Sequence, residues 1–155
     1  MRIAFRALGI AIVALVAVQA AAHAWSSAGL GLFVEGGGVV DLSLMASEEA
    51  PFPEVMGFMI HGMNGMFVIP VVALALLIVS FFVRIRGAVV WAAITFGLVI
   101  LQVTLGIFGH SYSILGLLHG LNALVLATAA LYTQSLARTA RATYPSDAEQ
   151  STIHA

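Results

Sequence analysis

The chain has 155 residues and a net charge of −1; 61% of its residues are hydrophobic and only 8% are charged. A soluble domain carries about a quarter charged residues because its surface faces water, so this composition excludes an ordinary soluble protein. The scarcity of basic residues excludes a nucleic-acid partner, and the lack of cysteine excludes disulfides and thiolate metal sites. The sequence therefore indicates an integral protein of the lipid bilayer.

Four hydrophobic segments follow one another along the chain, each near the ~20 residues that cross a bilayer as a helix. They are Ala7–Trp25, Val55–Val83, Gly87–Gly109 and Ile114–Ala137. Their apolar residues are continuous rather than alternating, which favours helices over membrane β-strands. Pro70 is expected to kink the second helix. The predicted fold is an all-α bundle of four transmembrane helices in one domain, residues 1–141, with a disordered cytoplasmic tail at 142–155.

The basic residues all fall on one side of the four predicted spans. They are Arg2, Arg6, Arg84, Arg86, Arg138 and Arg141. The positive-inside rule therefore places both termini in the cytoplasm, and we expect a multi-pass protein of the bacterial inner membrane. A second interpretation makes the first segment a secretory signal, cleaved after Ala24 in the tripeptide Ala-His-Ala. The three remaining spans would keep the same orientation.

The outer loop, predicted from Ser26 to Glu54, contains acidic residues but no Lys or Arg. Its three consecutive glycines at 36–38 indicate a flexible break. Asp41 is then expected to cap a short interfacial helix that ends near Ala50, before two prolines. We interpret this helix either as a lid over the outer end of the bundle or as a passive connector.

An internal repeat relates the second and fourth segments. The residues HGMNG at 61–65 are echoed by HGLNA at 119–123, and Gln19 in the first segment is echoed more weakly by Gln102 in the third. Polar residues are rare inside membranes, so the match is specific. It predicts two helical hairpins in the same orientation, related by an axis along the membrane normal.

The repeat carries the polar groups that matter most. Counting from the outer ends of their spans places His61 and His119 at one level in the outer leaflet, and the cytoplasmic half is almost purely aliphatic. An ionisable group inside the bilayer is costly and suggests function. The alternative is structural, because His and Asn can hold helices together through hydrogen bonds worth about 0.6 kcal/mol each.

Two histidines at one depth on alternate helices are arranged as the axial ligands of a haem would be. Asn64 and Asn122 each follow their histidine by three residues, where an amide can orient an imidazole or bind a propionate. Small residues beside the histidines would let a neighbouring helix or a flat macrocycle approach the backbone; these are Gly57, Gly65, Gly116 and Gly120. The sequence predicts one low-spin haem b near the outer face, with His61 and His119 as axial ligands of the iron.

The expected role of this haem is electron transfer or haem handling, with electrons supplied by quinol or by a redox partner at the outer face. The alternative is a non-enzymatic structural or accessory subunit whose His and Asn residues only join helices. Methionines at 56, 59, 63 and 66 suggest a Cu(I) site, but they lie opposite His61 on the helical wheel, which favours packing or lipid contact. A solute or ion carrier is a third interpretation, disfavoured by the apolar inner half. No residue pattern decides whether the protein is an enzyme.

Two resemblances accompany these residues. From Arg2 to about Arg138 the chain resembles an uncharacterised family of small bacterial four-helix membrane proteins that carry the same two histidine motifs. The pair His61 and His119 also resembles one four-helix half of haem A synthase, which has a histidine pair on its second and fourth helices and an extended first outer loop. This second resemblance implies a bis-histidine haem.

The chain departs from the haem A synthase pattern at three points. The segment 57–60, directly before His61, contains no acidic residue, and the outer loop contains no cysteine. A second bundle is also missing, and a homodimer would supply it. The resemblance therefore extends to the haem-holding half and not to oxidative haem A synthesis.

Overall fold

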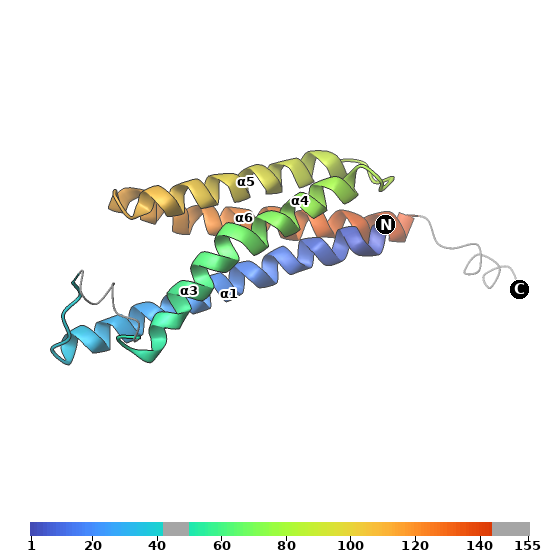
Figure 1. Cartoon of the computed structure of the whole chain (residues 1–155). Coiled ribbons are helices and arrows are strands. Elements are labelled where there is room, and N and C mark those ends of the chain that lie inside the picture. Colours follow the sequence, from blue (N-terminus) through green and yellow to red (C-terminus); the bar gives the residue numbers. More distant parts are fainter. Residues whose placement is uncertain (42–49, 144–155) are drawn as a thin grey trace, which may run out of the picture. The chain divides into compact units, whose positions relative to one another are not determined.

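The computed structural model describes residues 1–41 and 50–143, and every regular element in these ranges is a helix. In chain order the elements are α1 (Arg2–Glu35), the 3₁₀-helix η1 (Pro53–Val55), α3 (Met56–Met63), the π-helix η2 (Asn64–Val68), α4 (Ile69–Ser80), α5 (Ala88–Gly109) and α6 (Ser113–Thr143) (Figure 1). The predicted lid helix after Asp41 falls on residues outside the described ranges, as does the tail beyond Thr143.

Four stretches of the described residues are long and apolar enough to cross a membrane. They are Arg2–Glu35, Pro53–Ser80, Ala88–Gly109 and Ser113–Arg138. The all-α class and the four candidate spans predicted from composition are therefore confirmed, and the chain is a multi-pass membrane protein.

The chain divides into two compact units. One unit is Ala14–Ile69, and the other combines Met1–Val13 with Pro70–Ala155, so that α1 contributes to both. Within the first unit, α1 and α3 lie side by side and run antiparallel; within the second, α5 and α6 do the same (Figure 1). We refer to these as the α1–α3 pair and the α5–α6 pair.

Helix α1 extends further than the sequence indicated. The loop predicted to start at Ser26 begins only after Glu35. No proline interrupts this stretch, and the Ser26 hydroxyl donates a hydrogen bond to the carbonyl of Glu54 at 2.6 Å, which attaches the helix to the start of the second span. The helix ends where Gly37 adopts a left-handed φ of 91°. The N–H of Gly38 then donates to the carbonyl of Phe33 at 2.9 Å, which closes the last turn in a Schellman-like arrangement.

The second span contains a widened turn before Pro70. Proline has no N–H to donate, and its ring clashes with the carbonyl four residues earlier. Here the chain accommodates this residue by forming η2, in which the N–H of Ile69 donates to the carbonyl of Asn64, five residues back. The consequence of Pro70 is therefore a π-helical turn that begins at Asn64. Helix α4 ends at Ser80, short of the predicted Val83.

The α5–α6 pair is packed through small side chains. Ala92 and Ala130 are fully buried, whereas large apolar residues such as Leu124 are exposed on the outer surface, where lipid would contact them. The buried hydroxyls of Thr95 and Thr133 lie 3.1 Å apart, and each also donates to a main-chain carbonyl of its own helix. The prediction that the half remote from the histidines is almost purely aliphatic overlooked these two threonines.

Candidate functional site

The first polar cluster joins α1 to α3 and consists of Gln19, His61 and Asn64. The Nδ1 atom of the half-buried His61 lies 3.2 Å from the carbonyl oxygen of Gln19. A carbonyl only accepts hydrogen bonds, so Nδ1 carries the hydrogen, and in the neutral imidazole Nε2 then carries the lone pair. The contact thus selects one tautomer of His61 and directs its basic nitrogen away from α1.

Asn64 completes this first cluster. Its amide Nδ2 donates to the carbonyl of Leu15 at 3.2 Å and to the side-chain oxygen of Gln19 at 3.3 Å, and the residue is only 7% exposed. Both acceptors belong to α1, at positions one turn apart. Asn64 therefore ties η2 to the same stretch of α1 that accepts the hydrogen bond from His61.

The second polar cluster joins α5 to α6 and consists of Gln102, His119 and Asn122. The Nδ1 atom of half-buried His119 lies 3.0 Å from the carbonyl oxygen of Gln102, and the Gln102 amide donates to the carbonyl of His119 at 3.0 Å. Asn122, which is 8% exposed, donates to the carbonyl of Leu98 at 3.0 Å and to the side-chain oxygen of Gln102 at 2.6 Å.

Three hydrogen bonds of the first cluster recur in the second, which has in addition the bond from the Gln102 amide to the carbonyl of His119. In each, the imidazole Nδ1 donates to the glutamine carbonyl, and the asparagine amide donates to the glutamine side chain and to the leucine carbonyl one turn earlier. Gln19 is thus central to the first cluster and Gln102 to the second, although the predicted site did not include them. Their weak sequence echo was the available signal, but it did not reveal which atoms they contribute.

The four predicted site glycines have different surroundings. A Cβ on buried Gly57 would meet the carbonyl of Ala22 at 2.5 Å, and one on Gly65 would meet the Gln19 amide nitrogen at 2.5 Å, so both face α1. Gly116 and Gly120 on α6 are exposed, and apart from the neighbouring backbone of α6 no described atom lies within 4 Å of the position that a Cβ would occupy.

The surroundings of the two imidazoles also differ. The ring of His23, on α1, has its centroid 4.9 Å from that of His61, and the rings of His23 and Phe58 meet edge to face with centroids 5.7 Å apart. Gly106 occupies the corresponding place on α5, four residues after Gln102. A Cβ there would lie 3.0 Å from Cε1 and 3.2 Å from Nδ1 of His119. The His119 ring therefore lies directly over the α5 backbone.

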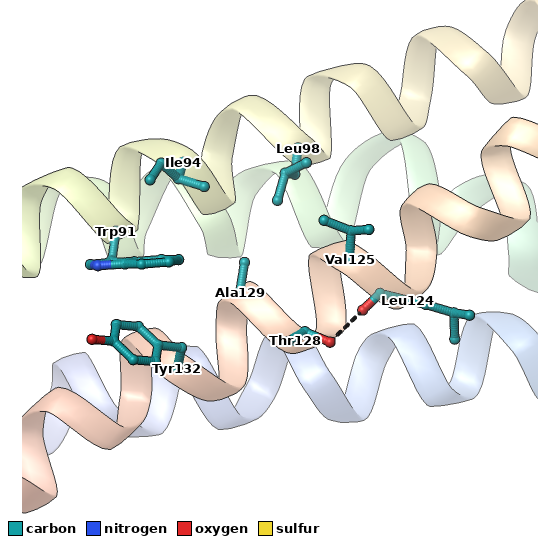
Figure 2. A pocket seen from close by; sticks show the side chains of 8 residues that line it. All are labelled: Trp91, Ile94, Leu98, Leu124, Val125, Thr128, Ala129 and Tyr132. Carbon is teal, nitrogen blue, oxygen red and sulfur yellow. Dashed lines mark hydrogen bonds between the residues drawn. The ribbon is translucent and has the colours of Figure 1, made fainter.

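An apolar groove of about 450 Å³ lies on the α5–α6 pair, away from His119. At one end the rings of Trp91 and Tyr132 face each other with centroids 4.2 Å apart, and the hydroxyl of Thr128 is bound to the Leu124 carbonyl at 2.8 Å (Figure 2). The groove thus offers mainly hydrocarbon and aromatic surface to a bilayer, with no further histidine or carboxylate on its wall.

Within residues 1–41 and 50–143, no group of three or more His, Asp or Glu side chains is close enough to hold a metal ion. A haem needs only two axial side chains, because the macrocycle supplies the other ligands. The four methionines of the stripe that includes Met59 are exposed.

Comparisons of the chain with protein-family models, with curated proteins and with solved structures found no match. The candidate site therefore rests on its own residues and contacts.

Proposed function

We propose that the protein binds one b-type haem near the outer face of the membrane, with Nε2 of His61 and Nε2 of His119 as the axial ligands of the iron. The observation that supports this assignment most strongly is the shared Nδ1 contact, because each imidazole donates to a glutamine carbonyl. Histidines that ligate metals almost always donate their other ring nitrogen in this way, which sets the tautomer and the ring orientation.

The donor chemistry of the chain fits haem. Two neutral imidazoles with unprotonated Nε2 atoms are the ligand set of a low-spin bis-histidine haem. In this proposal Asn64 and Asn122 hold the glutamine segments in place, since their amides are directed at α1 and α5. Gly116 and Gly120 leave open space beside His119 in which a flat macrocycle can approach α6, whereas Gly57 and Gly65 serve the close packing of α1.

We also infer that the α1–α3 and α5–α6 pairs are repeats of one hairpin in the same orientation. The three hydrogen bonds that recur between equivalent residues of the two pairs support this relation. With both termini in the cytoplasm of a bacterium, the two clusters belong to the outer leaflet of the inner membrane. Electron transfer from quinol or an outer-face redox partner, or haem handling, is the role that such a site supports. A homodimer would bring two four-helix units together, as in the two halves of haem A synthase.

A structural or accessory subunit is the second candidate function. It is favoured by the observation that the polar groups of both clusters bridge adjacent helices, while Gly57 and Gly65 allow α1 to come close. In that case the imidazoles serve as hydrogen-bond donors between helices, and their Nε2 atoms ligate no iron. The two candidates therefore differ in a single nitrogen of each ring.

The first experiment uses that difference. The protein, purified in mild detergent from haem-replete cells, should show a sharp Soret band and split α and β bands on reduction. His119→Asn keeps a donor near the Nδ1 position and removes Nε2, so it should keep the helical circular dichroism spectrum and lose the low-spin bands. A colourless wild-type protein that is helical and monodisperse would overturn the haem proposal and leave the structural one.

A further inference from the structure

The apolar groove on the α5–α6 pair changes in character along its length. Figure 2 shows the indole nitrogen of Trp91 and the phenol oxygen of Tyr132 at the same end of the groove, both directed away from its aliphatic residues. Within the described residues, neither of these two side-chain atoms takes part in a hydrogen bond. Further along, the Thr128 hydroxyl is already bonded to the Leu124 carbonyl at 2.8 Å. The groove therefore has two available hydrogen-bond donors at one end and hydrocarbon along the rest.

The polar end of the groove lies beside the turn that precedes α5. A Cβ on Gly87 would lie 3.7 Å from Cδ1 of Trp91, the ring carbon that is bonded to the indole nitrogen. Gly87 adopts a left-handed φ of 82° and turns the chain into α5. Arg86, directly before it, is exposed, as is Arg84. Two positive charges and two available donors are thus found at the same end of the groove.

No carboxylate compensates these two arginines within the described residues. The acidic residues of that part of the chain are Glu35, Asp41 and Glu54. Glu54 stands at the start of the second span and Arg84 follows its end, so the length of a span separates them along the chain. Exposed basic residues next to a transmembrane helix attract anionic lipid headgroups, and guanidinium groups bind phosphate through charge-assisted hydrogen bonds.

We propose that the groove binds one anionic phospholipid, with an acyl chain along α5 and α6 and its phosphate at Arg86. The indole N–H of Trp91 and the hydroxyl of Tyr132 donate to the phosphate or ester oxygens, which only accept hydrogen bonds. This assignment uses the α5–α6 pair and the turn before it, and it does not rest on the proposed haem.

The length of the groove favours a lipid chain over a second copy of the protein. From Trp91 to Leu98, at 1.5 Å per residue, the groove extends about 10 Å along α5. The hydrocarbon of one leaflet is about 15 Å deep, so the groove matches a chain of a single leaflet. A transmembrane helix of a second copy would instead pack along the whole ~30 Å of the core. A neutral isoprenoid quinone would leave Arg86 without a counter-charge.

The test uses Trp91 as the reporter. The full-length variant Trp25→Phe retains Trp91 as its single tryptophan and is reconstituted in phosphatidylcholine vesicles. A rising fraction of the lipid is then replaced by phosphatidylglycerol or phosphatidylcholine that carries bromine on its acyl chains. Bromine quenches indole fluorescence on contact, and each intensity is divided by that in vesicles of the same headgroup composition without bromine. The relative affinity should be about fivefold higher for phosphatidylglycerol, the effect of one arginine near a lipid surface.

Two arginine variants distinguish a binding site from a general effect of charge. Arg86→Gln should abolish the preference for phosphatidylglycerol and keep the helical circular dichroism spectrum. Arg138→Gln removes the same charge, but Arg138 follows Tyr132 by six residues and lies about 120° around α6 from it. This variant should keep the preference. In Trp91→Phe, the remaining Trp25 on α1 should be quenched equally by the two brominated lipids.

Three results would overturn the proposal. Equal quenching of Trp91 by the two brominated lipids would show that the groove accepts any lipid. Equal loss of the preference in Arg86→Gln and Arg138→Gln would show an effect of the overall charge and not of a site. An absence of quenching at Trp91 by either lipid would show that another occupant, such as a second copy or a quinone, covers the groove. None of these results depends on whether the protein binds haem.

Discussion

The two polar clusters use the same three residue types and share three equivalent hydrogen bonds, and these bonds are shorter in the cluster on α5 and α6. Its three shared distances are 3.0, 3.0 and 2.6 Å, against 3.2, 3.2 and 3.3 Å in the cluster on α1 and α3. The residues of the clusters do not explain this difference. The clusters contain the same residue types, so the difference in hydrogen-bond length arises from the helices and side chains around them.

The surroundings differ in backbone as well as in side chains. Asn122 lies within the uninterrupted helix α6, whereas Asn64 is the first residue of the π-helical turn that precedes Pro70. A π-turn widens the helix locally, so its first residue does not occupy the place that it would have in a regular α-helix. The looser α1–α3 cluster is therefore the one with the widened turn and the second imidazole.

The largest expected effect on stability comes from placing a histidine at Gly106 of the α5–α6 pair, the position that corresponds to His23 of the α1–α3 pair. Gly106→His would force the His119 ring off its place, because a Cβ at this position already lies 3.0 Å from Cε1. Overpacking of this kind costs about 1–3 kcal/mol, and thermal unfolding in detergent, followed by circular dichroism, should show a clear fall in the midpoint. The matched change His23→Ala should leave the midpoint almost unchanged, and equal falls in both variants would contradict the asymmetry.

A smaller effect is expected from removing the amides. Asn122→Leu keeps the approximate volume and deletes two interhelical hydrogen bonds, which in membranes amount to about 1 kcal/mol in total. Asn64→Leu deletes two longer bonds and should cost less. The measurement is the unfolding free energy of each variant in the same detergent. A larger loss for Asn64→Leu than for Asn122→Leu would reverse the order of the two clusters.

The smallest effect is expected at the glycine after Asn64. Gly65→Ala gains up to about 1 kcal/mol of helix propensity, but its methyl group displaces the Gln19 amide, which lies 2.5 Å from the Cβ position. The two effects should nearly cancel in the unfolding free energy. The displacement is detected by a double-mutant cycle, because Asn64→Leu should cost less in the Gly65→Ala background than in the wild type. Strict additivity would mean that the methyl group leaves the cluster undisturbed.

The four spans could be predicted because an apolar segment of bilayer length that lacks charged residues has few alternatives to a transmembrane helix. Their ends were less predictable. Ser26 is as compatible with a loop as with a helix, and only its hydrogen bond to Glu54 shows why α1 continues. Likewise, Pro70 indicates an irregular helix, but the sequence does not show that the irregularity is a π-helical turn beginning at Asn64.

The candidate site was predictable in its residue types and not in its contacts. His61 and His119 stand out because ionisable residues are costly in a membrane. The contribution of Gln19 was hidden, because the atom that orients His61 is a main-chain carbonyl that any residue could provide. The role of Gly57 was equally ambiguous, since a small residue admits a helix or a ligand alike, and only the position of Ala22 decides between them.

The amide hydrogen bonds of Asn64 and of Asn122 each join the two helices of one antiparallel pair, and this has a consequence for biogenesis. When α3 follows α1 out of the ribosome, the amide of Asn64 finds both of its acceptors on α1. The α5–α6 pair completes its own set in the same way, across the short connection between Gly109 and Ser113. Each pair can thus leave the insertion machinery for lipid with these amides already bonded. Processing after Ala24, by contrast, would remove the acceptors of Asn64 from the first pair.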